Sequence, residues 1–157
     1  MDLDAFDRRI LSLLQQDNRM PQRDIAEAVG LSSSAVNRRI AALEDAGVVQ
    51  ANVAIVDPAK VGRPITIIAE VAVESERLDL LDTVRRRFER SPAVQQVYYV
   101  TGDVDFVLVV TVADMAEYER LTRELFFSGG NVRRFRTLVA MERSKVSLSV
   151  SMAQESG

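Results

Sequence analysis

Five polar side chains between residues 32 and 38 are suited to contacts with nucleic acid: Ser32, Ser33, Ser34, Asn37 and Arg38. Asparagine pairs bidentately with adenine, arginine binds guanine or a phosphate, and serine binds either bases or phosphates. The serines stand where a helix is predicted to begin, and the free N–H groups at a helix start attract phosphate. Each residue alone is also typical of a solvated helix face, so the DNA-binding interpretation depends on the elements that hold them together.

A second group of candidate ligands is the run Thr101, Gly102, Asp103, Val104 and Asp105. The glycine lets the backbone approach a small molecule and turn an N–H toward a carboxylate. The two aspartates are able to accept hydrogen bonds from an ammonium group. The run is therefore either a clamp for an amino-acid zwitterion or an ordinary hairpin turn with solvated acids, because turns favour the same residue types.

The composition argues against an enzyme. The chain has no histidine and no cysteine, which removes the commonest general base, the commonest metal ligand and all disulfides. We find no nucleophile–base pair, metal-ligand cluster or phosphate-binding loop in the sequence. We therefore predict no catalytic residue, no metal site and no cofactor other than a small-molecule effector.

Three helices are predicted to position the serine-rich segment. Asp4 caps the first, Pro21 opens the second, and Gly30 ends the second in the left-handed conformation. Only Leu31 then precedes Ser32, which is a good N-cap for the third helix. Such a tight helix-turn-helix fixes the third helix so that its N-terminal half can enter a major groove.

The third helix is predicted to have a buried face and an exposed face. The buried stripe consists of Val36, Ile40 and Leu43. The polar candidates Ser34, Asn37 and Arg38 lie opposite this stripe. Arg39 lies beside it, so we expect Arg39 to pair with a nearby Asp or Glu.

The second half alternates strand-like and helical patterns in the order βαββαβ, which is typical of the ferredoxin-like split βαβ fold. The predicted strands cover residues 64–74, 94–101, 105–113 and 132–142, with a short fifth at 145–150, and the helices cover 78–90 and 114–127. The fold class is thus α+β, with a winged helix-turn-helix followed by a ferredoxin-like domain. The predicted domain limits are 1–56, including a strand-like segment at 48–56, a linker at 57–63, the second domain at 64–150, and a tail at 151–157.

The third predicted strand of the second half is apolar on both faces. A sheet of this topology carries its helices on one face, so the other face should be polar unless something covers it. Val107 and Val109 point to that open face, and Ile68 points the same way in the first strand. We predict that a second copy covers the face, sheet against sheet. The alternative covers are the N-terminal domain and the C-terminal tail.

The helix-turn-helix run at residues 30–49 resembles that of the Lrp/AsnC (feast/famine) regulators. The segments 3–11, 101–106, 114–118 and 132–137 also fall at places typical of that family, so the resemblance covers nearly all of residues 2–150. One departure concerns the loop, because family members often carry an aromatic residue between its two acids, where this chain has Val104. This departure bears on the side chain that the loop would accept.

The resemblance implies a transcriptional regulator, commonly of amino-acid metabolism. It implies dimers that assemble further, often into octamers around which DNA can wrap. It also implies an effector, usually an amino acid, that binds where dimers meet and contacts the Thr101–Asp105 loop. Thr137 and the Gly129–Gly130 loop of the facing subunit are further candidates for this site.

The charge pattern gives no electrostatic footprint of a DNA-binding protein. The net charge is −3, and residues 1–56 carry six Arg against eight Asp and Glu, which sums to −2. DNA affinity must therefore come from a local cationic face. The run Arg85–Arg87 is predicted to be a solvated helix face.

No apolar run reaches the roughly 18 residues that cross a bilayer, and the acidic first residues lack the basic part of a signal peptide, so we expect a cytoplasmic location.

The predicted function is sequence-specific, effector-responsive regulation of transcription. The partners are double-stranded DNA, further copies of the chain and a small molecule, with no membrane. One alternative is an architectural DNA-wrapping protein with little sequence preference. Another is a metabolite-binding regulatory subunit whose N-terminal domain contacts protein, which the acidic first half leaves open.

Overall fold

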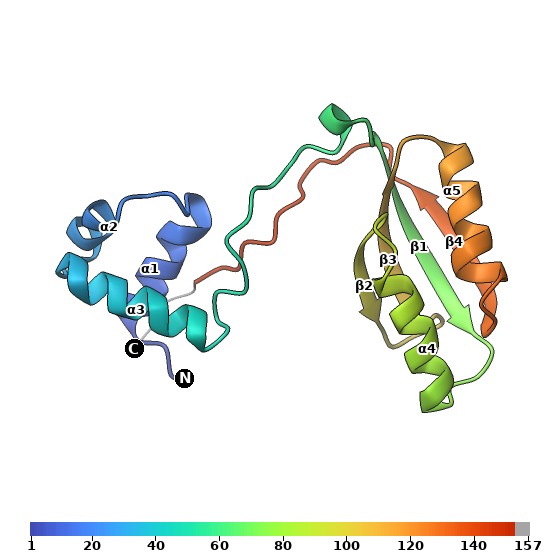
Figure 1. Ribbon diagram of the computed structural model, residues 1–157, viewed down its shortest axis with the longest axis horizontal. Coiled ribbons are helices and arrows are strands. Elements are labelled where there is room, and N and C mark those ends of the chain that lie inside the picture. Colours follow the sequence, from blue (N-terminus) through green and yellow to red (C-terminus); the bar gives the residue numbers. More distant parts are fainter. Residues whose placement is uncertain (153–157) are drawn as a thin grey trace. The chain divides into compact units, whose positions relative to one another are not determined.

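The computed structural model describes residues 1–152, which fold into two units (Figure 1). Of the described residues, the first unit contains Met1–Ala54 and 146–152, and the second contains Ile55–Lys145. Each unit has its own apolar core.

The first unit is built from three helices, α1 (Ala5–Gln16), α2 (Gln22–Val29) and α3 (Ser33–Asp45). The Asp4 side chain accepts a hydrogen bond from the Asp7 N–H at 2.9 Å, and the Asp7 side chain accepts one from the Asp4 N–H at 3.1 Å. This reciprocal capping box begins α1. Gly30 ends α2 at a φ of 76°, where glycine is favoured, and Ser32 caps α3. The three predicted helices and their caps are confirmed.

The core of the first unit collects one apolar stripe from each helix. Its buried members are Ile10, Leu11, Ile25, Ala26, Val29, Val36 and Leu43. Ile40 packs against them and is half-buried. The predicted inward stripe of α3 is thus the one that the structure buries.

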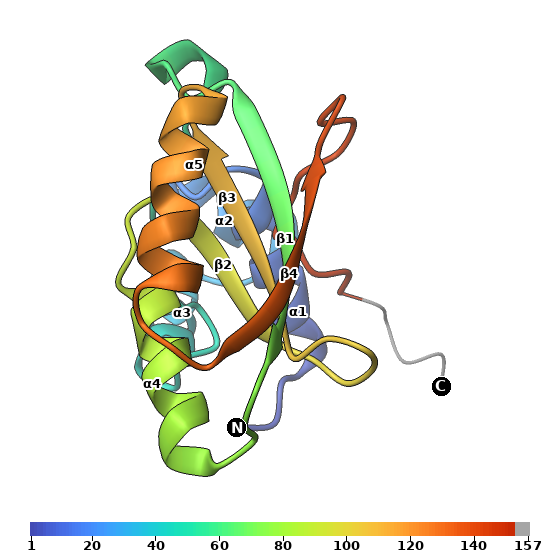
Figure 2. The ribbon, with the colours of Figure 1, turned by 90° about the vertical axis from the view of Figure 1, so that its right-hand side faces the viewer.

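The second unit is a four-stranded antiparallel sheet with two helices. Its elements are β1 (Ile65–Val73), α4 (Leu78–Glu89), β2 (Val94–Tyr99), β3 (Phe106–Val112), α5 (Met115–Thr122) and β4 (Val132–Val139), with a π-helical turn at Arg123–Phe127 after α5. The strand order is β2-β3-β1-β4, the order of the ferredoxin-like fold. Helices α4 and α5 lie on one face of the sheet (Figure 2). The fold class predicted from the sequence is confirmed.

Aromatic side chains join the helices to the sheet. The Phe88 ring of α4 meets Phe106 of β3 edge to face at 5.5 Å and meets Phe126 of the π-helical turn at 5.8 Å, measured between ring centroids. Such edge-to-face pairs are favourable beyond the area that they bury. They fix the helices on one face and leave the opposite face of the sheet open.

Two of the predicted strands are wrong. Residues 48–56 and 145–150, all of which the structure describes, contain no strand. Residues 145–150 alternate polar and apolar side chains and residues 48–56 are rich in β-branched ones, yet Ile55 and Leu148 are exposed. A strand exists only through hydrogen bonds to a neighbouring strand, and an alternating pattern does not supply that neighbour.

The predicted linker 57–63 belongs to the second unit. A 3₁₀ turn forms at Ala59–Val61, and Pro58 is buried. Arg63 donates to the Thr111 carbonyl at 3.3 Å and to the Glu117 carboxylate at 2.5 Å. These bonds attach the end of the segment to β3 and α5, which explains why it is not a free connection.

The end of the predicted second domain, residues 146–150, belongs to the first unit. The Gln15 side chain donates to the Val150 carbonyl at 3.0 Å and accepts from the Val150 N–H at 2.6 Å. Met152 packs against the core of the three helices. Of the predicted tail 151–157, residues 153–157 lie outside the described residues.

Candidate DNA-binding surface and effector site

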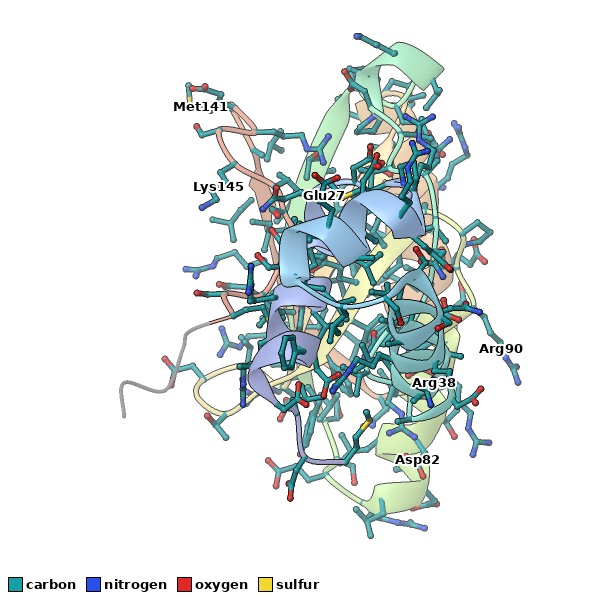
Figure 3. All side chains as sticks on the ribbon, turned by 90° about the vertical axis from the view of Figure 1, so that its left-hand side faces the viewer. Glu27, Arg38, Asp82, Arg90, Met141 and Lys145 are labelled. Atoms are coloured by element: carbon teal, nitrogen blue, oxygen red, sulfur yellow. The ribbon has the colours of Figure 1, made fainter. Side chains whose placement is uncertain are left out.

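The predicted DNA-binding residues lie on one exposed face of α3. Val36 and Leu43 are completely buried, so the helix is held with this stripe inward. The side chains of Ser33, Ser34, Asn37 and Arg38 are exposed, and Figure 3 labels Arg38 on this helix. The arrangement brings two hydroxyls, an amide and a guanidinium onto a single helix face, where they are able to contact bases and phosphates.

Ser32 is bound to the helix that it precedes. Its Oγ accepts a hydrogen bond from the Ala35 N–H at 3.2 Å and lies 3.1 Å from the Ser34 Oγ. This cap satisfies one of the first N–H groups of α3, and a helix start has others that point outward toward a ligand. Ser32 therefore orders the helix start, while Ser33 and Ser34 stand beside it.

An ion cluster fixes α3 against α1. Arg39 Nη1 lies 2.7 Å from the Asp7 carboxylate and 2.9 Å from that of Asp4, so the predicted pairing of Arg39 is confirmed. Asp7 is buried, and the Arg39 guanidinium also lies 5.5 Å from the centre of the Phe6 ring. A hydrogen bond from the Asp7 N–H, aided by Arg39, holds the pKa of Asp4 below its usual value, and the two carboxylates raise the pKa of Arg39. The cluster holds the exposed face of α3 in one orientation.

Sequence reasoning missed Gln22, the first residue of α2. Its Nε2 donates to Asn37 Oδ1 at 3.1 Å, so an exposed side chain of α2 contacts the predicted reading face of α3. Neither helical periodicity nor capping chemistry contains a signal for this pair. Only the crossing of the two helices brings the residues together.

The loop of residues 101–105 connects β2 to β3. Gly102 adopts a φ of 117°, a conformation that favours glycine, and Thr101 and Asp103 are exposed. Asp105 has a different role, since its N–H donates to the Val71 carbonyl at 2.9 Å and its carboxylate accepts from the Val73 N–H at 2.8 Å. Asp105 thus anchors the loop to β1, whereas Asp103 is exposed to solvent.

A cavity of about 130 Å³ lies beside this loop. It is lined by Glu70, Asp103, Val104, Arg134, Phe135 and Arg136. Arg136 Nε donates to the Glu70 carboxylate at 2.6 Å, and this bond holds the pKa of Glu70 below its usual value. Arg134 donates to the Asp103 carbonyl at 3.2 Å. The cavity can offer carboxylates to an ammonium group and guanidinium groups to a carboxylate.

Sequence reasoning missed Glu70, Arg134 and Arg136 as cavity residues. Glu70 and Arg136 are direct neighbours in the register of β1 and β4. The predicted ferredoxin-like fold has its first and fourth strands side by side, as the structure does, so the opposite charges on these two strands were a usable signal.

Thr137 lies beside α5 and not beside the loop of residues 101–105. Its hydroxyl is 2.6 Å from the Tyr118 hydroxyl of α5, on the sheet face that the helices cover, and burial raises the pKa of Tyr118. Gly129 and Gly130 line a separate cavity of about 340 Å³ with Asn131 and the start of α4. A single chain therefore does not assemble Thr137 or the glycine loop with residues 101–105.

The open face of the sheet carries apolar side chains. Ile68 is 38% exposed and Leu138 is 41% exposed, and Val107 and Val109 are half-buried beside them. No helix within residues 1–152 is long and apolar enough to cross a membrane.

Comparison with known proteins identifies both parts of the chain. Residues 3–50 match the model of winged helix-turn-helix DNA-binding domains, and residues 66–150 match that of Lrp/AsnC ligand binding domains. The chain is 42% identical to an HTH-type transcriptional regulator of Sinorhizobium fredii, over 96% of this chain and 89% of the relative.

Two solved structures share the architecture. An AsnC family transcriptional regulator from Agrobacterium tumefaciens matches with a TM-score of 0.90 at 31% identity, covering 96% of this chain and 97% of that chain. A transcriptional regulator from Neisseria meningitidis, solved as a complex with L-Met, matches with a TM-score of 0.89 at 25% identity and the same coverage of both chains. By sequence and by fold, the chain belongs to the Lrp/AsnC family: it is a DNA-binding transcriptional regulator with a ligand-binding domain, and not an enzyme.

Proposed function

We propose that the chain reads a specific DNA sequence with α3, through Ser33, Ser34, Asn37 and Arg38. The observation that carries this proposal is that all four side chains are exposed on a helix whose opposite stripe is locked in the core. Ser32 supports the contact by capping the helix and ordering its first turn. The N-terminal half of α3 then enters the major groove, as in other helix-turn-helix proteins.

We propose further that two copies pack through the open sheet face. Ile68, Val107 and Val109 supply apolar surface that a second sheet would remove from water. Paired α3 helices would then read half-sites about one helical turn apart. Assembly beyond the dimer, toward octamers, is proposed from the family resemblance.

The proposed effector is an amino acid that binds at the cavity beside the 101–105 loop. Asp103 and Glu70 would face its ammonium group, while Arg134 and Arg136 would face its carboxylate. Gly102 allows close approach, Thr101 stands at the edge of the loop, and Val104 lines the cavity where an effector side chain would lie. Asp105 keeps the loop in shape. The complex of the Neisseria meningitidis regulator with L-Met supports this choice of ligand class.

The facing subunit completes the proposed effector site. Thr137 and the Gly129–Gly130 loop would contribute from a neighbouring copy. A ligand held between copies stabilises an assembly by its higher affinity for that assembly than for the separated parts.

An Arg38→Ala substitution tests the DNA-reading assignment. Gel shifts with the full chain, across a series of salt concentrations, should show an affinity loss of about 1–3 kcal/mol if Arg38 contacts a base, or a salt slope lower by about 1 if it contacts a phosphate. Arg86→Ala, which removes an exposed arginine from α4, is the matched control. Unchanged affinity and slope in the Arg38 variant would show that this face of α3 does not meet DNA.

Competition with random DNA tests specificity against architectural wrapping. A sequence-specific regulator should prefer its operator by about 10³-fold or more at physiological salt. Similar affinity for both DNAs would instead favour the wrapping function.

Calorimetric titration with each amino acid tests the effector site. We expect heat from at least one amino acid with the full chain, and none with Asp103→Ala. Asp79→Ala, an exposed acid on α4, should bind as the unmodified chain does. If no amino acid gives heat, the proposed effector class is wrong.

A further inference from the structure

We propose that the Glu70–Arg136 ion pair belongs to the dimer interface, where each side chain balances the charge of the other when a second copy excludes water. This inference rests on the proposed packing of two copies through the open sheet face. It adds a charged pair to a surface so far described by its apolar side chains, and it makes an intact pair a condition for dimer formation.

The strand registers arrange the open sheet face in rows that cross the four strands. The side chains of one row are Gln96, Val109, Ile68 and Leu138. Those of the next row are Tyr98, Val107, Glu70 and Arg136. Side chains two residues apart on a strand point to the same face of the sheet. The ion pair therefore stands directly beside Ile68 and Leu138, the apolar side chains that a second sheet would cover.

A second sheet cannot cover the apolar row alone. A stable interface takes about 20–30 residues from each partner, whereas one row supplies a single side chain from each strand. On the other side of the apolar row, Thr66 and Thr111 are already buried within the chain. The exposed surface continues toward Glu70 and Arg136, so a sheet-to-sheet dimer covers them as well.

The pair has little effect on a single chain, because water still reaches it. The Arg136 side chain is 70% exposed and that of Glu70 is 23% exposed, and exposed ion pairs contribute little to stability. A second copy changes this balance, since a charge that loses its water without a partner is strongly unfavourable. Arg136 directs Nε and Nη2 to the same Glu70 carboxylate oxygen, at 2.6 Å each, so the two charges are balanced before the second copy arrives.

Arg134 makes the two members of the pair unequal. The pKa of Glu70 is lowered first by the hydrogen bond from Arg136, and the nearby charge of Arg134 adds to the effect. Two guanidinium groups thus act on one carboxylate. Loss of Glu70 deprives both arginines of this carboxylate, whereas loss of Arg136 leaves Arg134 to balance Glu70. The proposal therefore predicts a larger effect at Glu70 than at Arg136.

Three variants separate charge balance from mere contact. Glu70→Gln keeps the size of the side chain and removes its charge, so it should raise the dimer dissociation constant about thirtyfold or more, the effect of removing one member of a buried charged pair. Arg136→Gln should raise it less. The double variant Glu70→Val with Arg136→Val should keep the dissociation constant within about threefold of that of the unmodified chain, because packed apolar side chains often replace a buried pair without loss of stability.

Sedimentation of the full chain over a range of concentrations measures the dissociation constant. No amino acid is added, because Glu70 and Arg136 also line the cavity beside the 101–105 loop. The matched control is Glu119→Gln, which breaks an exposed pair at α5, where Glu119 and Arg123 lie 2.7 Å apart. The helices lie on the opposite face of the sheet (Figure 2), so this control should dimerise as the unmodified chain does. Urea unfolding of every variant checks that the fold is retained.

Failure of the dimer and failure of the ion pair are distinguishable. If the unmodified chain is monomeric, or if Ile68→Asp, which places a charge in the apolar row, leaves the dissociation constant unchanged, the sheet-to-sheet dimer is wrong and this inference falls with it. If Ile68→Asp separates the copies but Glu70→Gln dimerises as tightly as the unmodified chain, the pair lies outside the interface and this inference alone is wrong. Loss of the dimer in the double valine variant would also overturn it, because charge balance would then not be what the interface requires.

Discussion

Helix α3 and the loop between β2 and β3 carry the two candidate sites, and they differ in how many of their polar groups are already bonded. On α3, Arg38 and the serines are exposed, while the residues that hold the helix point the other way. In the loop, Asp105 is bonded to β1, and Arg134 donates to the Asp103 carbonyl. A helix separates support from contact by its 3.6-residue period, whereas a short loop must use the same few residues for both.

The difference shows how far one chain by itself arranges the polar groups of each candidate site. The exposed face of α3 presents Arg38 to solvent, and its other polar groups are bonded only to neighbours within the three-helix unit, Asn37 to Gln22 and Ser34 to Ser32. The cavity beside the 101–105 loop pairs its own charges, Glu70 with Arg136. A ligand in the proposed effector site would therefore exchange existing interactions for new ones, whereas DNA at the proposed contact with Arg38 would mainly add them.

The largest effect is expected from Ile68→Asp, which tests whether half-site reading needs a second copy. A charge on the open sheet face would be buried without a partner in a sheet-to-sheet dimer, so the dimer should dissociate. Loss of paired reading should lower affinity for the operator about a hundredfold or more. Sedimentation and gel shifts measure both effects. Leu78→Asp, on an exposed residue of α4, is the control, and a dimeric Ile68 variant with full affinity would overturn the sheet-face assignment.

Asp7→Asn tests whether the ion pair between Asp7 and Arg39 stabilises the packing of α3 against α1. Asp7 is buried and accepts from Arg39 at 2.7 Å, and a hydrogen bond between charged groups contributes about 2 kcal/mol. We expect the first unit to lose about that much unfolding free energy in urea. Asp2→Asn, on an exposed acid, should change little. Equal stability of both variants would mean that the ion cluster does not hold the helix.

Asp105→Ala and Asp103→Ala sharpen the contrast inside the loop. The first removes the acceptor of the Val73 N–H and should cost about 1–2 kcal/mol of unfolding free energy. The second removes an exposed carboxylate and should change stability by less than about 0.5 kcal/mol. Urea unfolding of the two variants gives the comparison. The reverse order would show that Asp103, and not Asp105, is the anchor of the loop.

Glu117→Gln tests how the unfolding free energy of the second unit depends on pH in the acidic range. The Glu117 carboxylate accepts from the Ala113 N–H at 2.6 Å and from Arg63, and these bonds hold its pKa below the usual 4.5. Because the pKa is lower in the folded state, the stabilisation is complete above about pH 4.5 and is lost as the pH falls through the folded value.

Glu117→Gln should therefore show a smaller fall in unfolding free energy between neutral and acidic pH than the unmodified chain. Urea unfolding in buffers on both sides of pH 4.5 measures this difference. The exposed acid Glu124, changed to Gln, provides the control. An unchanged pH dependence in the Glu117 variant would locate the acid sensitivity elsewhere.

Local chemistry explains what the sequence predicted well. Asp4, Gly30 and Ser32 act within one helical turn of their own positions, so their caps could be inferred without knowledge of the fold. The apolar stripes and the order of strands and helices follow from periodicity in the same way. The exposed polar face of α3 was predicted because it is the side opposite a buried stripe.

Contacts between distant residues account for what was missed. The run Arg85–Arg87 was interpreted as solvated, yet Arg87 donates to the Gly130 carbonyl at 2.9 Å, and burial lowers its pKa. The contact is possible because Gly129 has no side chain, since a Cβ there would lie 1.6 Å from the Arg87 guanidinium. Gln22 with Asn37, and Glu70 with Arg136, depend in the same way on element crossings that local patterns do not encode.

The return of the chain to α1, through Gln15, Val150 and Met152, makes the sensing unit an insertion within the DNA-binding unit. The backbone therefore passes between the units twice, after Ala54 and again before Val146. A single flexible connection would leave the three-helix unit free to rotate. A second connecting segment, anchored at both ends, closes a loop and removes much of that freedom. A displacement at the end of β4 would therefore reach the three helices through two covalent connections instead of one.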